Sequence, residues 1–345
     1  MGYRYSVDGD FWTDDQKPGF IMDRILEYRV KDSDLDKTVG GILVKVLKHC
    51  MGLTPHEISH AKFTPGGITV LRNGDQTGLY ESVTVKDRVN AGDIVKVLFS
   101  DEVEKDEEKV LAVKGDIRIL YEDEDVIVLN KPAGVVSHPS HGHYRDSLAN
   151  YLAAYYEASG KSGKLRTVGR LDKDTSGAIL FAKNAPAASR LFRQKDNGLF
   201  RKTYLAVTQN PPKENEKKKW NVIDSPIGPV PGTLMKQQII APPEGKNALT
   251  RYFCCEEHDG ISVIKAEIET GRTHQIRVHM ASIGHPLIGD KMYGATMEGS
   301  LDVDRALLHA WKMTFKQPFG TADISIKAPI PEDMRKYICE EKLDS

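Results

Sequence analysis

An acidic loop that runs directly into an apolar segment carries the residues best suited to chemistry. The loop is Gly169–Gly177, where Asp172 stands two residues after Arg170, and the apolar run Ala178–Ala182 follows at once. A loop held by a rigid strand can aim a side chain accurately, so Asp172 is a candidate catalytic carboxylate. Asp, Ser and Gly also bond their own backbone in turns, and this segment alone fits an ordinary turn better.

Three further segments share this mixture of polar and basic residues with apolar runs: Leu129–Gly134, Arg201–Val207 and Thr270–Met280. Together with Gly169–Gly177, in this order, they resemble the pseudouridine synthases of the large-ribosomal-subunit and transfer-RNA type. The resemblance covers roughly the last two thirds of the chain. That family usually has His before its Arg-Leu-Asp triplet, whereas this chain has Gly169, as in the related small-subunit rRNA branch. The exchange bears on the RNA target, not on the chemistry.

The resemblance implies an enzyme that isomerises uridine in RNA. The reaction breaks the bond between ribose and the ring nitrogen, turns the uracil and rejoins it through carbon. It needs no redox change, group donor or phosphoryl transfer, so we expect no cofactor and no metal ion. It needs one ionised carboxylate at the ribose–base junction, which the resemblance identifies as Asp172. Attack on the ribose carbon, addition to the ring and removal of a ribose proton are three roles that the sequence leaves open.

Arg277 and Tyr204 complete the catalytic set that the resemblance implies. Arg277 is the expected ion-pair partner of Asp172, because a guanidinium offsets the tendency of burial to disfavour a carboxylate's charge. An interdomain or surface ion pair is the alternative for Arg277. The target base must leave a folded RNA and enter a pocket, where Tyr204 is expected to stack on it. A tyrosine in a strand also serves core packing, and both roles can hold.

Supporting residues are expected around the extruded base. Arg170 is the candidate to occupy or brace the vacated position in the base stack. The resemblance places Lys131 near the catalytic acid, and Leu287 and Ile288 are expected to form an apolar wall for the uracil. Four basic residues are candidates for phosphate contacts: Arg201, Lys202, Lys236 and Arg272.

Other reactive side chains in this region have simpler explanations. Asp174 is interpreted as a turn or capping group, because the motif places its acid directly after Arg-Leu. Ser176 lacks a nucleophile-elbow pattern. His138, His141 and His143 crowd one short loop, but no carboxylate or cysteine arrangement completes a metal site.

Two rival functions are open to test. One is a non-catalytic RNA-binding or ribosome-assembly factor on the same fold, although such a protein would not need Asp172, Tyr204 and Arg277 together. The other is a hydrolase that pairs Ser176 with a histidine, for which the sequence offers no supporting context.

The composition is that of a soluble protein with two domains and tails. The chain has 345 residues, 40% hydrophobic and 28% charged, with a formal net charge of −1. An RNA-binding surface must therefore come from local segregation of charge. The four cysteines show no metal-ligand spacing and are interpreted as reduced thiols. The polar N-terminus predicts no secretory signal, and no apolar run is long enough to cross a bilayer. We expect a cytoplasmic monomer whose partner is structured RNA. Ribosomal RNA is the first candidate and transfer RNA the second.

The N-terminal part predicts a flexible arm over residues 1–22 and a small α/β RNA-binding module over 23–100. Helical spacing over 38–47 and a capping box at Thr54–Glu57 precede strand-like pieces at 68–70, 83–85 and 94–98. This order resembles the alpha-L RNA-binding motif of a small-subunit ribosomal protein. From residue 24 to 98, eleven Lys/Arg against nine Asp/Glu leave a net charge of +2. The candidates for phosphate contacts here are Lys45, Lys48, Lys62 and Arg72.

The rest of the chain predicts an acidic linker over 101–115, a catalytic domain over 116–333 and a C-terminal tail over 334–345. Helices are expected at 147–159 and 184–197. Strands are expected at 126–129, 178–183, 203–208, 249–255, 261–269 and 323–328. Many strands with few intervening helices predict an α+β fold, in which a mainly antiparallel mixed β-sheet is flanked by helices and loops.

Overall fold

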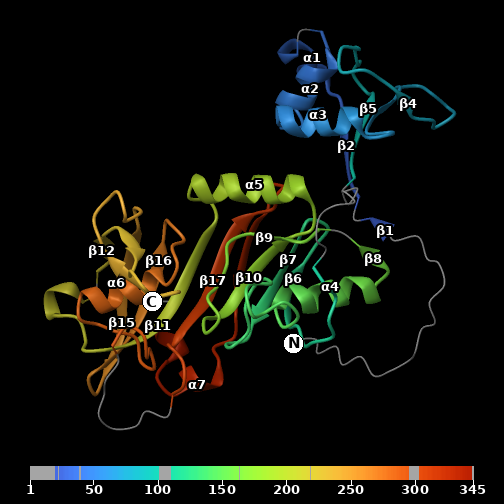
Figure 1. Cartoon of the computed structure of the whole chain (residues 1–345). Helices are drawn as coiled ribbons and strands as arrows, with labels where there is room; N and C mark the ends of the chain where they lie inside the picture. The colour runs from blue at the N-terminus through green and yellow to red at the C-terminus, as the bar shows by residue number, and fades with distance from the viewer. Residues whose placement is uncertain are drawn as a thin grey trace.

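The computed structural model describes residues 20–21, 23–38, 40–100, 110–162, 164–217, 219–294 and 303–343. The described strands form two main sheets, one in the N-terminal part and one in the rest of the chain (Figure 1). The mixture of helices with a mainly antiparallel sheet confirms the predicted α+β class. Most of the predicted arm and residues 101–109 of the predicted linker lie outside the described residues.

The N-terminal part is a four-stranded antiparallel sheet covered by three helices. The strand order is β2 (Arg24–Arg29), β5 (Ile94–Phe99), β3 (Ile68–Leu71) and β4 (Glu81–Ser82). The helices are α1 (Asp32–Lys37), α2 (Leu43–His49) and α3 (Pro55–Phe63). The capping box at Thr54 and Glu57 is confirmed. The helix predicted from residue 38 begins only at Leu43, because Gly40 and Gly41 adopt left-handed φ angles of 70° and 75°.

The second sheet has ten strands and supports the candidate site. Its main path runs β12 (Asn221–Asp224), β15 (Leu249–His258), β16 (Ile261–Ile268), β11 (Arg201–Gln209), β17 (Leu308–Lys316), β10 (Ser176–Ala182), β7 (Val126–Lys131) and β6 (Ile119–Glu122). β18 (Asp323–Lys327) pairs with β17, and β9 (Arg166–Thr167) pairs with β10. Among the described pairings of this sheet only β10 with β17 is parallel. The close approach of these two strands needs a glycine at position 177, since a Cβ there would stand only 2.3 Å from the Ala310 carbonyl oxygen.

Alternate residues of β7 and β10 face two different cores. Helices α4 (Leu148–Ala158) and α6 (Gln275–Ser282) pack with the core that contains Ile127 and Ile179. Helix α5 (Ala185–Asp196) packs with the core that contains Val126 and Leu180. All of Val126–Leu129 is therefore buried, as its continuous apolar character predicts.

Short elements complete the described structure. They are the parallel pair β1 (Phe20–Ile21) and β8 (Lys161–Ser162), the hairpin β13 (Ile227–Pro229) and β14 (Gln237–Ile239), the helix α7 (Glu332–Arg335), and two 3₁₀ turns, η1 (Glu214–Glu216) and η2 (Glu340–Lys342).

The described part of the segment expected to be a C-terminal tail is packed into the fold. Met334, Ile338 and Leu343 are buried in one cluster with Leu205 and Val207 of β11. Burial of these apolar side chains stabilises the packing of residues 334–343 against the sheet, because their exposure would leave a hydrophobic patch in water.

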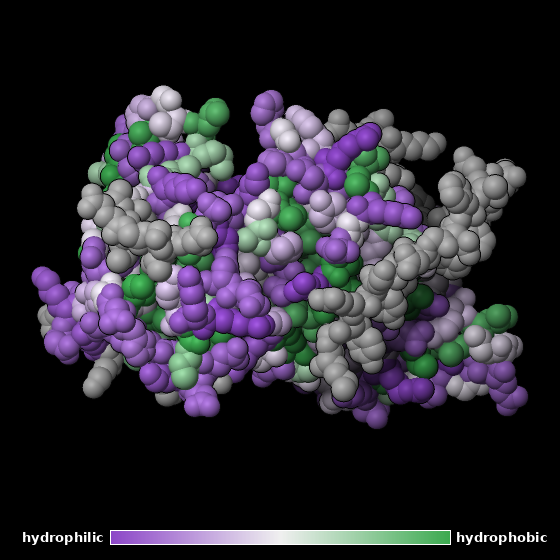
Figure 2. Space-filling view, turned by 90° about the horizontal axis from the view of Figure 1, so that it is seen from below, coloured by the Kyte–Doolittle hydropathy of each residue, from purple (hydrophilic) through white to green (hydrophobic). Residues whose placement is uncertain are grey.

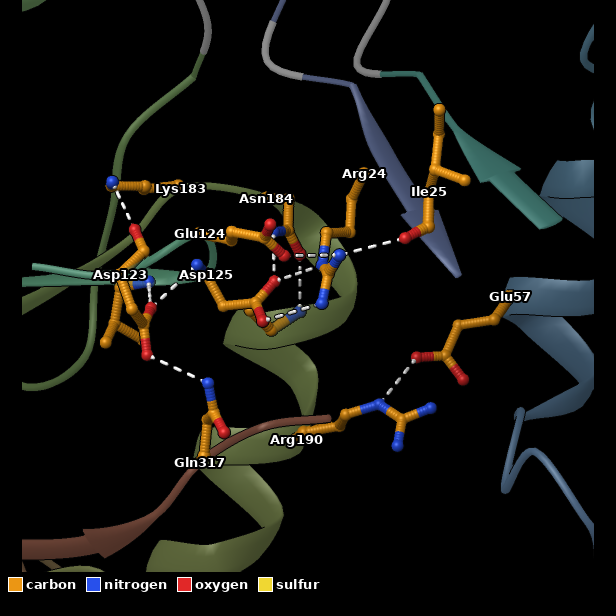
Figure 3. A network of polar contacts seen from close by, with 12 residues as sticks. Arg24, Ile25, Glu57, Asp123, Glu124, Asp125, Lys183, Asn184, Arg190 and Gln317 are labelled. Carbon is orange, nitrogen blue, oxygen red and sulfur yellow. Dashed lines mark hydrogen bonds and ion pairs between the residues drawn. The ribbon is translucent and has the colours of Figure 1, made fainter. Parts of the chain in front are cut away.

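An arginine–carboxylate joint ties the N-terminal sheet to the second sheet (Figure 3). Arg24, at the start of β2, donates two hydrogen bonds to the carboxylate of Asp125, at 2.7 and 3.2 Å. Asp125 is fully buried and also accepts a bond from Asn184, the N-cap residue of α5. The guanidinium groups of Arg24 and Arg190 both stack on Phe319.

We expect Arg24→Met to lower the free energy of unfolding by up to about 3 kcal/mol, because it leaves a buried carboxylate without its cation. Burial raises the pKa of Asp125, and Arg24 opposes that rise. A double-mutant cycle with Asp125→Asn, measured by chemical denaturation, should give a coupling energy of about 1–3 kcal/mol. Arg29→Met is the matched control, because the Arg29 side chain on the same strand bonds only the Gly92 carbonyl among the described residues. Equal losses for the two arginines would contradict the joint.

Hydrophilic side chains dominate the face of the molecule shown in Figure 2, with smaller apolar patches between them. Among the described helices, none has both the length and the apolar character needed to span a membrane.

Candidate active site

A cleft of about 800 Å³ gathers most of the predicted site residues. Its walls come from the loop between β9 and β10, the start of β11, the last turn of α5 and the loop between β16 and α6. Six predicted residues line it: Arg170, Asp172, Arg201, Lys202, Tyr204 and Arg272. Five others are not among its lining residues: Lys131, Lys236, Arg277, Leu287 and Ile288.

Asp172 lies half-buried on a loop that is fixed on both sides. The hydroxyl of Ser137 donates to the Leu171 carbonyl at 2.8 Å and accepts from the Leu171 amide at 3.1 Å. The Asp172 carbonyl accepts from the Thr175 amide at 3.1 Å, which closes a turn. The predicted turn and the predicted catalytic position are thus compatible features of one loop.

Two cations hold the backbone just after Asp172. The ammonium of Lys131, which is fully buried, donates to the carbonyls of Lys173, Pro132 and Val135 at 2.9, 2.9 and 2.6 Å. Burial lowers the pKa of Lys131 to about 7, while the nearby Asp172 and Asp174 oppose that shift. Three acceptors match the three N–H groups of a charged ammonium, so the geometry favours the charged form.

Arg305 is the second of these cations, and sequence reasoning missed it. Its guanidinium donates to the Asp174 carbonyl at 3.0 Å and forms a bidentate pair with Asp333 of α7 at 2.6 and 2.9 Å. No motif near Arg305 pointed to this contact, because the residues it joins are distant in sequence.

Tyr204 lies in β11 with 5% of its surface exposed. Its partners on the neighbouring strands are Ala266 and Ala310, whose side chains are small, and Tyr204 is among the residues that line the cleft. Burial, and then the charge of Asp172, raise the pKa of Tyr204, so the phenol stays neutral. A neutral aromatic ring beside a carboxylate is suited to stacking on a base.

Arg277 forms an ion pair, but with Asp290 rather than with Asp172 as predicted. The pair is bidentate, with both N–O distances at 2.7 Å, and the Asp290 side chain is fully buried. Asp290 also accepts from the amides of Met292 and Tyr293 and so closes the turn beneath the guanidinium. Burial alone would lower the pKa of Arg277, but Asp290 and the nearby charge of Asp172 together raise it. Arg277 therefore acts on Asp172 through space.

Gln275 organises the loop that faces Asp172 across the cleft. Its side-chain carbonyl accepts from the Thr270 hydroxyl at 2.8 Å and the Arg272 amide at 3.0 Å, and its amide donates to the Leu249 carbonyl at 2.9 Å. Arg170 then donates to the Thr273 hydroxyl at 3.0 Å, which links the two loops. The sequence motif contained Gln275, but only the structure shows this role.

Leu287 and Ile288 do not form the predicted apolar wall. Ile288 exchanges backbone hydrogen bonds with Val207 and Leu307, and Leu287 pairs with Thr208. This pairing alongside β11 turns both side chains into the cores, where they are 0% and 2% exposed. The apolar lining of the cleft comes instead from Val168, Leu171, Phe200, Ile268, Ile276 and Leu308, together with Tyr204.

The four basic residues proposed for phosphate contacts divide into two groups. Arg201 and Arg272 line the cleft and each bonds a nearby carbonyl, that of Gly198 and that of Asn247. Lys202 also lines the cleft. Lys236 is exposed in the turn between β13 and β14 and is not among the residues that line the cleft.

Ser176 does meet a histidine, but the pair is sealed inside the protein. Its hydroxyl lies 2.9 Å from Nδ1 of His309, and the two residues are 3% and 1% exposed. Burial lowers the pKa of His309 to about 4. Neither residue is among those that line the cleft, which leaves a hydrolase without an accessible nucleophile. Within the described ranges, no group of three or more His, Cys, Asp and Glu could hold a metal ion.

Comparisons with known proteins point to the same family as the sequence motifs. The family model described as RNA pseudouridylate synthase matches residues 125–282. The uncharacterised RNA pseudouridine synthase YjbO of Bacillus subtilis is 36% identical over 288 residues, which is 84% of this chain and 95% of that protein. The ribosomal large subunit pseudouridine synthase D of Vibrio cholerae is 36% identical over 260 residues, 72% of this chain and 76% of that protein. The solved structure of human RNA pseudouridylate synthase domain containing 4 has a similar fold, with a TM-score of 0.52 at 20% identity over 63% of this chain and 92% of that one.

Proposed function

Because this chain belongs to the RNA pseudouridine synthase family, we propose that it isomerises uridines of ribosomal RNA with Asp172 as the catalytic carboxylate. The observation that carries the proposal is the placement of Asp172 and Tyr204 in one cleft, where the charge of Asp172 acts on the Tyr204 phenol. The alternative of a non-catalytic factor has no comparable support. We also propose that the enzyme works as a cytoplasmic monomer without a cofactor.

In the proposed reaction, the target uridine leaves the RNA and stacks on Tyr204. The glycosidic bond from ribose to N1 breaks, the uracil turns, and a new bond forms from the same ribose carbon to C5. C5 loses its proton and N1 takes one up, so the composition of the nucleotide is unchanged. All three possible roles of Asp172 need its carboxylate ionised. Lys131 and Arg277 bring positive charge near this carboxylate, since each interacts electrostatically with Asp172. We propose that Arg170 braces the vacated stack, and its contact with Thr273, which links the two loops, supports this role.

Ribosomal RNA is our first choice of substrate because the Vibrio cholerae relative is named for the large ribosomal subunit. Transfer RNA is the second choice. We propose residues 23–100 as the RNA-binding module and 116–333 as the catalytic domain. Three lysines of the module, Lys45, Lys48 and Lys62, are the candidates for phosphate contacts. Arg72 is no longer one of them, because it pairs with Glu81 and Asp93.

Mapping of modified uridines tests this function directly. RNA from a strain that lacks the protein should be missing pseudouridine at one or a few positions of ribosomal RNA. A plasmid with the parent gene should restore them, and one with Asp172→Asn should not. Loss of pseudouridine only from transfer RNA would correct the substrate, and an unchanged map would remove the proposal.

If Tyr204 stacks on the base, two substitutions at this position should lower activity to different extents. Tyr204→Phe keeps the ring and should retain kcat/KM within a few-fold. Tyr204→Ala should lower it about 5- to 150-fold, since base–aromatic stacking contributes about 1–3 kcal/mol per base. Initial rates of pseudouridine formation on the same RNA measure both. Parent-like rates for the alanine variant would show that Tyr204 is a packing residue only.

A further inference from the structure

Two lysines enter the cleft without an acidic partner. Lys195 belongs to the last turn of α5, and Lys202 stands near the start of β11. In the part of the chain that the structure describes, neither ammonium makes an ion pair or a hydrogen bond with the protein. Each ammonium lies close to a glycine: a Cβ on Gly169 would stand 3.6 Å from Nζ of Lys202, and a Cβ on Gly271 would stand 3.5 Å from Nζ of Lys195. The only aromatic contact that the described residues give either lysine is that of Lys202 Nζ, 5.8 Å from the centre of the Phe200 ring, which carries no negative charge.

The positive charges of Lys195 and Lys202 repel each other in the absence of an anion. Burial, and then the charge of Lys195, lower the pKa of Lys202 to about 7. Carboxylates do line the same cleft, including Asp172, Asp196 and Glu267, but none of them pairs with either lysine. A cationic pair that the protein leaves unneutralised within a substrate cleft is suited to an anion that arrives with the substrate.

We propose that Lys195 and Lys202 together bind one phosphodiester group of the RNA, next to the uridine that enters the cleft. Lys202 and Tyr204 are two residues apart on β11 and both line the cleft. Their Cα atoms are therefore about 7 Å apart, which is within the reach of one nucleotide. A Cβ at position 169 or 271 would be in ordinary van der Waals contact with the ammonium group, so each lysine lies close to the backbone of a loop that lines the cleft. The inference rests on the proposed function for the identity of the anion.

The test is the salt dependence of kcat/KM for Lys202→Met, Lys195→Met and the double variant. The substrate is ribosomal RNA purified from the strain that lacks the protein. We expect each single variant to lower kcat/KM about 10- to 100-fold, the effect of losing a charged hydrogen bond. The slope of log kcat/KM against log salt should become less steep by about 0.7 to 0.9, the value for one phosphate contact. Because one phosphate is shared, the double variant should lose much less than the product of the two single effects.

Lys217→Met is the control, because Lys217 pairs with Glu214 and Glu257 and has no place in the cleft. It should leave both rate and slope unchanged. Circular dichroism checks that every variant is folded. An unchanged slope in Lys202→Met, or two single effects that simply multiply, would overturn the shared phosphate site. If the parent protein forms no pseudouridine at all, the proposed function fails instead, and filter binding of the same RNA still measures the slope.

Discussion

Replacement of Asp172 with Asn should abolish pseudouridine formation while the fold and RNA binding persist. Asparagine has nearly the same shape, and the hydrogen bonds that fix this loop use the backbone and the Ser137 hydroxyl rather than the Asp172 side chain. The change removes only the negative charge and the nucleophilic or basic oxygen. We expect kcat to fall by at least about 10⁴-fold, as for the removal of a reacting group in other enzymes.

Asp174→Asn is the matched control for this experiment. Asp174 stands two residues later on the same loop, and the contact that the structure gives it is through its carbonyl, which accepts from Arg305. Its amide variant should keep kcat within about threefold, as for surface changes without a lost contact. Kinetics, thermal unfolding and RNA binding are measured for both variants. Full activity of Asp172→Asn, or equal losses for the two, would show that the carboxylate of Asp172 is not the reacting group.

Local patterns in the sequence predicted the elements around this loop well. Helices α4 and α5 begin and end within one residue of the expected positions, because Ser147 and Asn184 cap their first turns and Gly198 follows the end of α5. The cleft lining also includes Asp172 and Tyr204, which belong to two of the four motifs. The motifs therefore identified residues that lie close together in the fold, although the sequence gives no tertiary contacts.

Helix α6 was missed because its local signals are weak. It has eight residues, begins after His274 in a left-handed conformation and has no side-chain N-cap bond. Its residues Gln275–Met280 are all buried, so no polar face marks a helical period. The partner of Arg277 was missed with it, because the choice between Asp172 and Asp290 depends on where α6 packs.

The predicted apolar wall was wrong, and the second cation that holds the loop after Asp172 was missed, for a similar reason. Ile288 lies alongside β11, a neighbour that its own sequence segment does not reveal. Arg305 reaches Asp174 over 131 residues and Asp333 over 28. Pairings at such distances follow from strand order, which single-sequence periodicity does not specify.

The Arg277–Asp290 pair gives the second large expected effect. Arg277→Met leaves the fully buried carboxylate of Asp290 without its cation, although two backbone amides still bond it. Removal of one partner of a buried ion pair lowers the free energy of unfolding by about 3–5 kcal/mol. The variant also loses the positive charge that acts on Asp172, so kcat should fall by about 10²-fold at a temperature where the protein is folded. Chemical denaturation and initial rates measure the two effects separately.

The double variant Arg277→Met with Asp290→Asn distinguishes the two roles of Arg277. It removes both charges, and an asparagine oxygen can still accept from the Met292 and Tyr293 amides, so most of the lost stability should return. The lost activity should not return, because the charge near Asp172 is still absent. Recovery of both would mean that Arg277 matters only by holding α6 against the turn at Asp290. Recovery of stability alone would mean that the positive charge of Arg277 contributes to the reaction at Asp172 in addition to its structural role.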